Sequence, residues 1–114
     1  MENTVRQKSY VFAVRIVRLC KHLANTKNEY IMSKQLLKAG TSIGANVAES
    51  EHAQSRPDFA SKLNIALKEA AETDYWLQLL HETDYLSEKE FTSIMKDCKE
   101  IESLLASIVK TLKK

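Results

Sequence analysis

Glycine and proline are scarce in this chain of 114 residues, which contains two Gly and one Pro. These residues provide most tight turns, and together they make up about 12% of an average protein. A β-sandwich or β-barrel needs a turn every ~8–12 residues, so the composition excludes both folds. Disorder is excluded as well, because 44% of the residues are hydrophobic. We therefore expect an all-α protein with one domain over residues 1–114, built from a few long helices.

Long apolar runs are also absent. No stretch of about 18 apolar residues occurs, and the first seven residues lack the basic and then apolar pattern of a secretion signal. We therefore expect a cytoplasmic protein with no membrane contact. The two cysteines, Cys20 and Cys98, are isolated and fall on the apolar stripes of different helices. This placement predicts reduced thiols in the core rather than a disulfide or a nucleophile.

Hydrophobic residues recur at spacings of three and four in four segments, which predicts amphipathic helices. Local signals mark where these helices begin. Ser55 is placed to cap a helix that has Pro57 in its first turn. Ser87 and Glu90, three residues apart, have the pattern of a capping box. The predicted helices span about residues 4–24, 30–52, 57–82 and 88–113. Because the loops between them are short, we expect an antiparallel up-down-up-down four-helix bundle.

The last predicted helix has the clearest repeat. Its apolar residues alternate between spacings of three and four up to the end of the chain, as expected for a helix with one buried stripe. We expect the following residues in the core: Phe91, Ile94, Cys98, Ile101, Leu105, Ile108 and Leu112.

Both glycines of the chain lie inside the second predicted helix. Gly40 and Gly44 are one helical turn apart, and Ala48 continues the row. One interpretation is a weak point, because each Gly costs a helix about 1 kcal/mol relative to Ala. The interpretation that we favour is a groove of small side chains that lets another helix approach closely.

Apolar side chains also fall on the outer side of the third predicted helix, opposite its buried stripe. A large stripe centred on a tryptophan is typical of a protein interface, so we expect a homo-oligomer. The alternative is that the third helix is deeply buried within its own bundle. The candidate interface consists of Val11 and Val14 on the first helix and of Ile65, Glu72, Tyr75, Trp76 and Leu79 on the third.

Positive charge is concentrated near the N-terminus. Residues 1–27 have a net charge of +5, whereas the whole chain has +2. In an up-down bundle the end of the last helix returns beside the start of the first, so the two ends form one basic pole. Such a surface can bind the phosphates of RNA or DNA, although a basic face is also explained by solvation and by lysines that complement a helix dipole. The candidate residues are Arg6, Lys8, Arg15, Arg18, Lys21, Lys110, Lys113 and Lys114.

Motifs for enzymatic chemistry are few. A di-iron bundle needs two Glu-x-x-His motifs, and only Glu49-x-x-His52 is present. No phosphate-binding glycine loop and no nucleophile elbow occurs. We therefore expect no cofactor and no enzymatic activity. The alternative, from another class of function, is a small metal-dependent enzyme that uses Glu49, His52, Glu69 and Glu72, which requires these groups to converge within about 4–5 Å.

Two stretches of the chain carry a resemblance to a known family. The first is the segment TSIGANVAE at 41–49, with Ser42, Ile43, Gly44, Asn46 and Glu49. The second follows Pro57 and contains Ile65-Ala66 and then KEAAETDYWL at 68–77, with Glu69 and Glu72. These stretches resemble the family of four-helix bundles known as ribosomal RNA intervening-sequence or S23-like proteins, over the length of the chain.

The resemblance implies a small antiparallel bundle that assembles into a ring-like homopentamer. Family members are encoded in insertions within bacterial large-subunit ribosomal RNA genes and elsewhere in bacterial genomes. A related branch, the accessory proteins of diversity-generating retroelements, forms basic pentamers that bind nucleic acid and a reverse transcriptase. By this resemblance the partners are a second copy of the chain, RNA or DNA, or a reverse transcriptase-like protein. The motif residues are then structural or inter-subunit contacts rather than catalysts.

Overall fold

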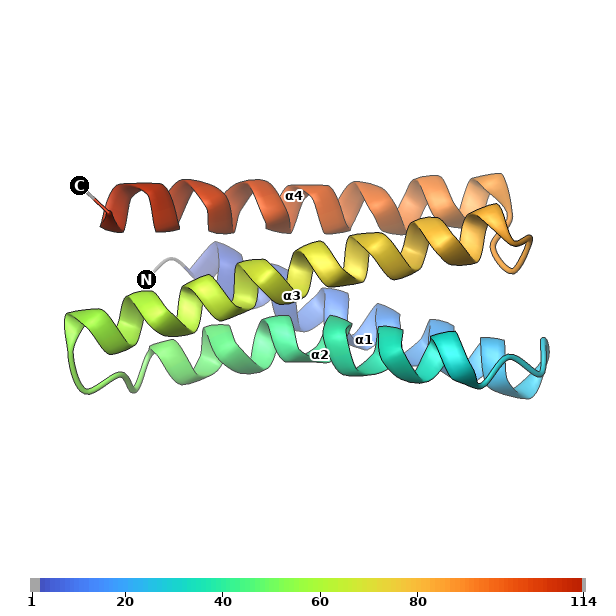
Figure 1. The fold of residues 1–114 in the computed structure, drawn as a ribbon, viewed down its shortest axis with the longest axis horizontal. Helices are drawn as coiled ribbons and strands as arrows, with labels where there is room; N and C mark the ends of the chain where they lie inside the picture. The colour runs from blue at the N-terminus through green and yellow to red at the C-terminus, as the bar shows by residue number, and fades with distance from the viewer. Residues whose placement is uncertain (1–2, 114) are drawn as a thin grey trace.

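The computed structural model describes residues 3–113 and contains four α-helices and, within that range, no strand. The helices are α1 (Asn3–Asn25), α2 (Ile31–Ser50), α3 (Arg56–Glu82) and α4 (Glu88–Leu112). They run alternately up and down, and both ends of the chain lie at the same end of the bundle (Figure 1). The predicted fold class is confirmed, and each predicted helix boundary lies within two residues of the observed one.

Side-chain caps fix the starts of α3 and α4 as the sequence predicts. The Ser55 hydroxyl accepts a hydrogen bond from the backbone N–H of Asp58 at 3.1 Å. At α4, the Ser87 hydroxyl accepts from the N–H of Glu90, and the Glu90 carboxylate accepts from the N–H of Ser87, which completes the capping box. These contacts satisfy N–H groups that have no partner within the helix, so both helices begin at a defined residue.

The start of α2 is capped by a residue that sequence analysis did not identify. The carboxylate of Glu29 accepts hydrogen bonds from the N–H groups of Ile31, Met32 and Ser33 at 3.1, 3.0 and 2.7 Å. Asn28, just before it, has a φ of 56°, in the left-handed region that Asn tolerates better than most residues. The turn thereby directs a buried carboxylate at the positive end of the α2 dipole.

The four helices enclose one apolar core. Phe12, Ile16 and Leu23 from α1 are fully buried. The buried apolar residues of the other three helices include Leu36, Ile43 and Val47 in α2, Leu63, Leu77 and Leu80 in α3, and Cys98, Ile101 and Leu105 in α4. The stripe of α4 differs from prediction at its two ends, where Phe91, Ile108 and Leu112 are only partly buried, while Val109 is buried instead of Ile108. An α-helix has 3.6 residues per turn, so a strict alternation of three and four drifts away from the core along a long helix.

Both cysteines are free and buried, as predicted. The thiol of Cys20 donates to the backbone carbonyl of Ser33 at 3.2 Å and thus links α1 to α2. Burial, together with the nearby charge of Glu29, raises the pKa of Cys20 to about 12. Since the thiolate is the reactive form, this thiol is unreactive at neutral pH.

Small residues let α1 and α2 pack closely. A Cβ atom added at Gly40 would lie 2.8 Å from Cγ2 of Ile16, and one added at Gly44 would lie 3.2 Å from the backbone oxygen of Ser9. The first of these distances is shorter than real side chains allow. The predicted close approach of another helix at the two glycines is therefore confirmed, and the helix that approaches is α1.

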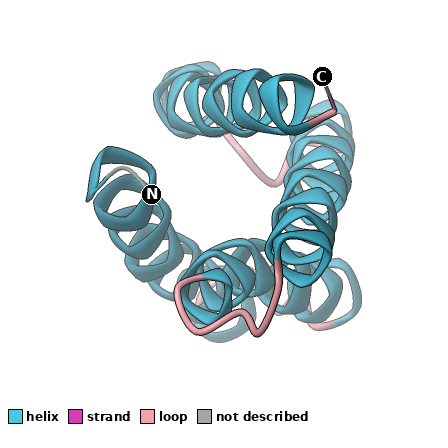
Figure 2. Ribbon diagram, turned by 90° about the vertical axis from the view of Figure 1, so that its left-hand side faces the viewer, coloured by secondary structure: helices cyan, strands magenta, loops and turns pink. Residues whose placement is uncertain are grey.

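The bundle measures 44 × 20 × 20 Å, and its helices follow one another around a square (Figure 2). Consecutive helices pack side by side, whereas α1 and α3 face each other across the diagonal. The contact between α1 and α4 is the least extensive of the four contacts between neighbours. None of the helices within residues 3–113 has the length and apolar character needed to span a bilayer.

Candidate interaction surfaces

The predicted basic surface of α1 is partly neutralised by carboxylates of other helices. Arg6 pairs with Glu51, just after α2, at 2.6 Å. Two further pairs cross from α1 to α4: Lys8 with Glu100 at 3.0 Å, and Arg15 with Asp97 at 2.6 Å. Each of these cations is therefore paired with a carboxylate of the same chain. A polyanion would have to displace that partner, so these three residues are weaker candidates than the sequence suggests.

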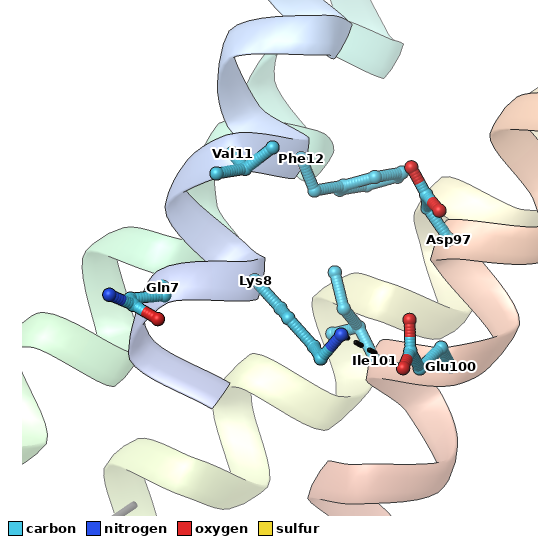
Figure 3. Close-up of a pocket in the computed structure, with 7 residues that line it drawn as sticks. All are labelled: Gln7, Lys8, Val11, Phe12, Asp97, Glu100 and Ile101. Carbon is cyan, nitrogen blue, oxygen red and sulfur yellow. Dashed lines mark ion pairs between the residues drawn. The ribbon is translucent and has the colours of Figure 1, made fainter. Parts of the chain in front are cut away.

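A pocket of about 290 Å³ lies where α1 and α4 diverge (Figure 3). Phe12 and Ile101 supply apolar walls, while Lys8 and Glu100 form an ion pair across the opening. The exposed side chain of Val11 lies at the rim. The pocket therefore combines apolar side chains with the charged groups of α1 and α4 that pair across it.

Other predicted cations lack a carboxylate partner. Arg18 and Lys21, in the second half of α1, make no ion pair within residues 3–113. Lys110 and Lys113 are exposed at the end of α4, at the same end of the bundle as the start of α1 (Figure 1). Lys114 lies outside the described residues. The charge that remains free is therefore found toward both ends of the bundle and not along the whole of α1.

The predicted oligomer interface divides into two surfaces, because α1 and α3 are diagonal to each other. Val11 on α1 is 58% exposed, and Val14, three residues further along the helix, is 36% exposed. On α3, Ile65 and Tyr75 are exposed and lie ten residues apart along the helix. No described contact joins the α1 set to the α3 set, so a single continuous patch containing all seven residues does not exist in one chain.

Trp76 is less exposed than the sequence suggests. Its ring is half-buried and packs against the core, and its indole N–H donates to the Glu72 carboxylate at 3.1 Å. The ring of Tyr75 meets it edge to face, with centroids 5.1 Å apart. Leu79 is also half-buried. Tyr75 and Leu79 line a hollow of about 330 Å³ between α3 and α4, together with Gln78, His81, Glu82 and Phe91.

A further apolar surface, at the start of α2, was missed by sequence analysis. Ile31 is 80% exposed, and Tyr30 and Leu37 are also exposed. Tyr30 and Leu37 line a hollow of about 480 Å³ between α1 and α2, which Lys21 and Lys34 flank. The sequence signal was available: these residues lie off the buried stripe that Leu36, Ile43 and Val47 define.

The family-motif residues make contacts within the chain. The Ser42 hydroxyl donates to the carbonyl of Lys38, and the Asn46 side chain donates to the carbonyl of Ser42. Ile43 is buried in the core, whereas Gly44 packs against α1. Glu49 pairs with Lys62 of α3 at 3.1 Å, and Glu69 is half-buried on α3. The first motif thus supports the packing of α2 against α1 and α3, consistent with the structural role that the resemblance implies.

A buried polar cluster between α3 and α4 was not predicted. Asp74 is 5% exposed and accepts hydrogen bonds from Gln78 at 2.6 Å and from Lys99 at 2.7 Å. Glu102 lies beside it. Burial and the adjacent Asp74 raise the pKa of Glu102 to about 7, so a protonated Glu102 can donate to Asp74. Burial opposes ionisation of Asp74, but hydrogen bonds from Glu102, Lys99 and Gln78 outweigh it and lower its pKa.

This cluster also contains the thiol of Cys98. Ligand atoms of Asp74, Cys98 and Glu102 lie within 4.8 Å of one another, and they form the only such group among the described residues. The Asp74 carboxylate is already bound by Lys99 and Gln78, and burial raises the pKa of Cys98 further above neutrality. The cluster is therefore a set of hydrogen-bonded side chains that joins α3 to α4.

The alternative metal-dependent site lacks the geometry that it requires. Glu49, His52, Glu69 and Glu72 form no converging group within residues 3–113. Instead, Glu49 pairs with Lys62, and Glu72 accepts from the Trp76 indole.

Comparison with known proteins places this bundle in a family. The family model for 23S rRNA-intervening sequence proteins matches residues 1–107. A crystal structure of a protein of unknown function from the S23 ribosomal protein family of Bacteroides thetaiotaomicron is 58% identical. The match covers 93% of this chain and 98% of the Bacteroides chain, with a TM-score of 0.92. No match occurs among proteins of curated function. Because the family match extends over nearly the whole sequence, the chain belongs to the 23S rRNA-intervening sequence protein family.

Proposed function

We propose that this protein is a non-enzymatic scaffold that works as a homo-oligomer. The supporting observation is the outer side of α3, where Tyr75 is exposed, Trp76 and Leu79 are half-buried, and Tyr75 and Leu79 line a hollow. A monomer leaves the exposed parts of these side chains in water, and burying them between subunits is favourable at about 25 cal/mol per Å² of apolar surface. The likeness of the motifs to ring-forming bundles makes a pentamer the expected assembly.

Light scattering coupled to gel filtration tests this proposal. A pentamer has a mass of roughly 65 kDa, five times the 13.0 kDa of the chain. A particle of 13.0 kDa at micromolar concentration would contradict the oligomer. An assembly of another size would support a scaffold and contradict only the pentamer.

The free cations favour a second activity, the binding of RNA or DNA phosphates. Arg18 and Lys21 have no carboxylate partner among the described residues, unlike Arg6 and Lys8. A ring of subunits would repeat this pair once per copy and so strengthen the attraction for a polyanion. The protein would then hold a nucleic acid, or a protein that processes one, against its surface.

Binding of a fluorescent single-stranded RNA across a salt series tests this activity. Each phosphate contact contributes about −0.7 to the slope of log affinity against log salt, so R18A with K21A should flatten the slope by up to about 1.4 per subunit engaged. The double variant R6A with K8A is the matched control and should change the slope less. Undetectable binding of RNA and DNA near 50 mM salt would leave a protein-only adaptor.

A further inference from the structure

The outer side of the first half of α2 presents exposed apolar and basic side chains together. We define the α2 face as Tyr30, Ile31, Lys34, Leu37 and Lys38, all of which are exposed. Lys34 and Lys38 form no ion pair within residues 3–113, and between positions 14 and 48 the chain has six Lys/Arg residues and one acidic residue. That residue is Glu29, whose carboxylate is buried against the α2 N-terminus.

The outer side of the second half of α3 has the opposite charge. We define the α3 face as Glu72, Tyr75, Trp76, Leu79 and Glu82. From position 69 to 82 the chain has four acidic residues and no Lys or Arg. One of the four, Asp74, is turned inward to Lys99, whereas Glu72 and Glu82 are exposed and give the α3 face its negative charge. The hollow of about 330 Å³ beside Tyr75 and Leu79 can accommodate an apolar side chain of another copy.

The two faces also lie at the same level along the bundle. The loop that precedes α2 and the loop that follows α3 are at the same end (Figure 1). At 1.5 Å per residue, Leu37 lies about 9 Å from the start of α2, and Trp76 lies about 9 Å from the end of α3. Two copies placed side by side in the same orientation therefore bring these faces to one height, with α2 of one antiparallel to α3 of the next. In that pairing the positive end of one helix dipole also lies near the negative end of the other.

We propose that the α2 face of one copy docks on the α3 face of another copy. The inference rests on the proposed homo-oligomer and names the surfaces that build it. Apolar side chains are present on both faces, and their charges are of opposite sign, so association is favoured in this pairing and opposed between two identical faces. Because the surfaces in contact differ, the interface is heterologous, and its repetition around an axis parallel to the bundle closes a ring when the rotation between copies divides a full turn.

Charge reversal on each face tests the pairing. The α2 variant carries K34E and K38E, and the α3 variant carries E72K and E82K. Each variant brings like charges together, and we expect the assembly to weaken by about 100-fold or more. Combining all four substitutions restores opposite charges and should restore the assembly. The control variant, K110E with K113E, changes the net charge as much as the α2 variant does but at the other end of the bundle, and it should assemble like the wild type.

The outcomes separate this inference from the proposed function. A monomeric wild type would overturn both the oligomer and the pairing. An assembled wild type whose α2 or α3 variant also stays assembled would overturn the pairing alone. So would a fourfold variant that keeps its helical circular dichroism but stays monomeric. Restored assembly in the fourfold variant would support the pairing, since two unrelated disruptions would not cancel.

A single apolar substitution provides an independent test. Ile31 is the most exposed large apolar side chain of the α2 face, and it begins the helix. I31D places a carboxylate in the first turn, which suits the α2 dipole and preserves folding. The pairing predicts a folded protein with weakened assembly. A folded I31D variant that assembles like the wild type would contradict it.

Discussion

The ammonium of Lys99 lies 2.7 Å from the carboxylate of Asp74 and joins α4 to α3 inside the contact between these helices. Asp74 and Glu29 are the buried charged groups among residues 3–113, and Gln78 holds the second oxygen of Asp74. We expect D74A to lower the free energy of unfolding by about 1–3 kcal/mol, because it leaves the Gln78 amide without its acceptor and breaks the link to Lys99. Urea denaturation measures this change. K96A, on the exposed side of α4, is the control and should stay within about 0.5 kcal/mol of the wild type.

The protonation of Glu102 should make stability depend on pH. Its pKa is about 7 in the folded protein, above the ordinary value of 4.5, so the folded state binds more protons between these values. Stability is therefore highest near the lower end of this range and falls as pH rises toward 7. Asp74 acts in the opposite direction but only at lower pH, because its pKa is lowered from 3.8.

Urea midpoints measured from pH 5 to pH 7 test this dependence. In the wild type the midpoint should fall over the range, and in E102Q it should change less, because the amide imitates the protonated acid without titrating. E100Q is the control: it removes a neighbouring carboxylate that pairs with Lys8 and should keep the fall. A wild-type midpoint that rises from pH 5 to pH 7 would contradict the assigned state of Glu102.

Close packing at Gly40 predicts an unusual response to alanine. In an ordinary helix position Gly to Ala adds about 1 kcal/mol of stability. At Gly40 the added Cβ would lie 2.8 Å from the buried Ile16 side chain, so G40A should instead destabilise the protein by about 1–3 kcal/mol. The control is A45G, on the exposed side of the same helix, which should cost about 1 kcal/mol through helix propensity alone. Thermal unfolding of a G40A protein more stable than the wild type would argue against this packing.

The helices were predictable because their signals are local. Each signal acts within a few residues of the helix that it marks. The helix starts predicted from Pro57 and from the capping box of Ser87 and Glu90 are confirmed, and so are the four helices predicted from the apolar periodicity. The partners of α1 cations were not predictable, because Arg6 pairs 45 residues away and Arg15 pairs 82 residues away. Such pairs depend on how far each helix slides and turns against its neighbour, which periodicity alone does not determine.

The missed features are of a different kind. Thr73 and Asp74 are consecutive in α3 and both are buried, although a strict heptad repeat places only one of two such neighbours in the core. A helix of 3.6 residues per turn buries a stripe wider than a strict heptad, and that stripe includes Asp74. The α2 face was not predicted, because Tyr30 and Ile31 stand at a helix start, where single apolar residues do not indicate which side of the helix is buried.

Glu29 offers a last test, because it is a buried carboxylate whose stabilising partners are mainly backbone groups. E29A removes the acceptor for the N–H groups of Ile31, Met32 and Ser33, and we expect it to cost about 2–3 kcal/mol. E29Q keeps one acceptor oxygen but loses the negative charge at the helix start, so its cost should be smaller. Hydrogen exchange should show faster opening of the first turn of α2 in E29A than in E29Q. Equal exchange in both variants would mean that the carboxylate does not hold this turn.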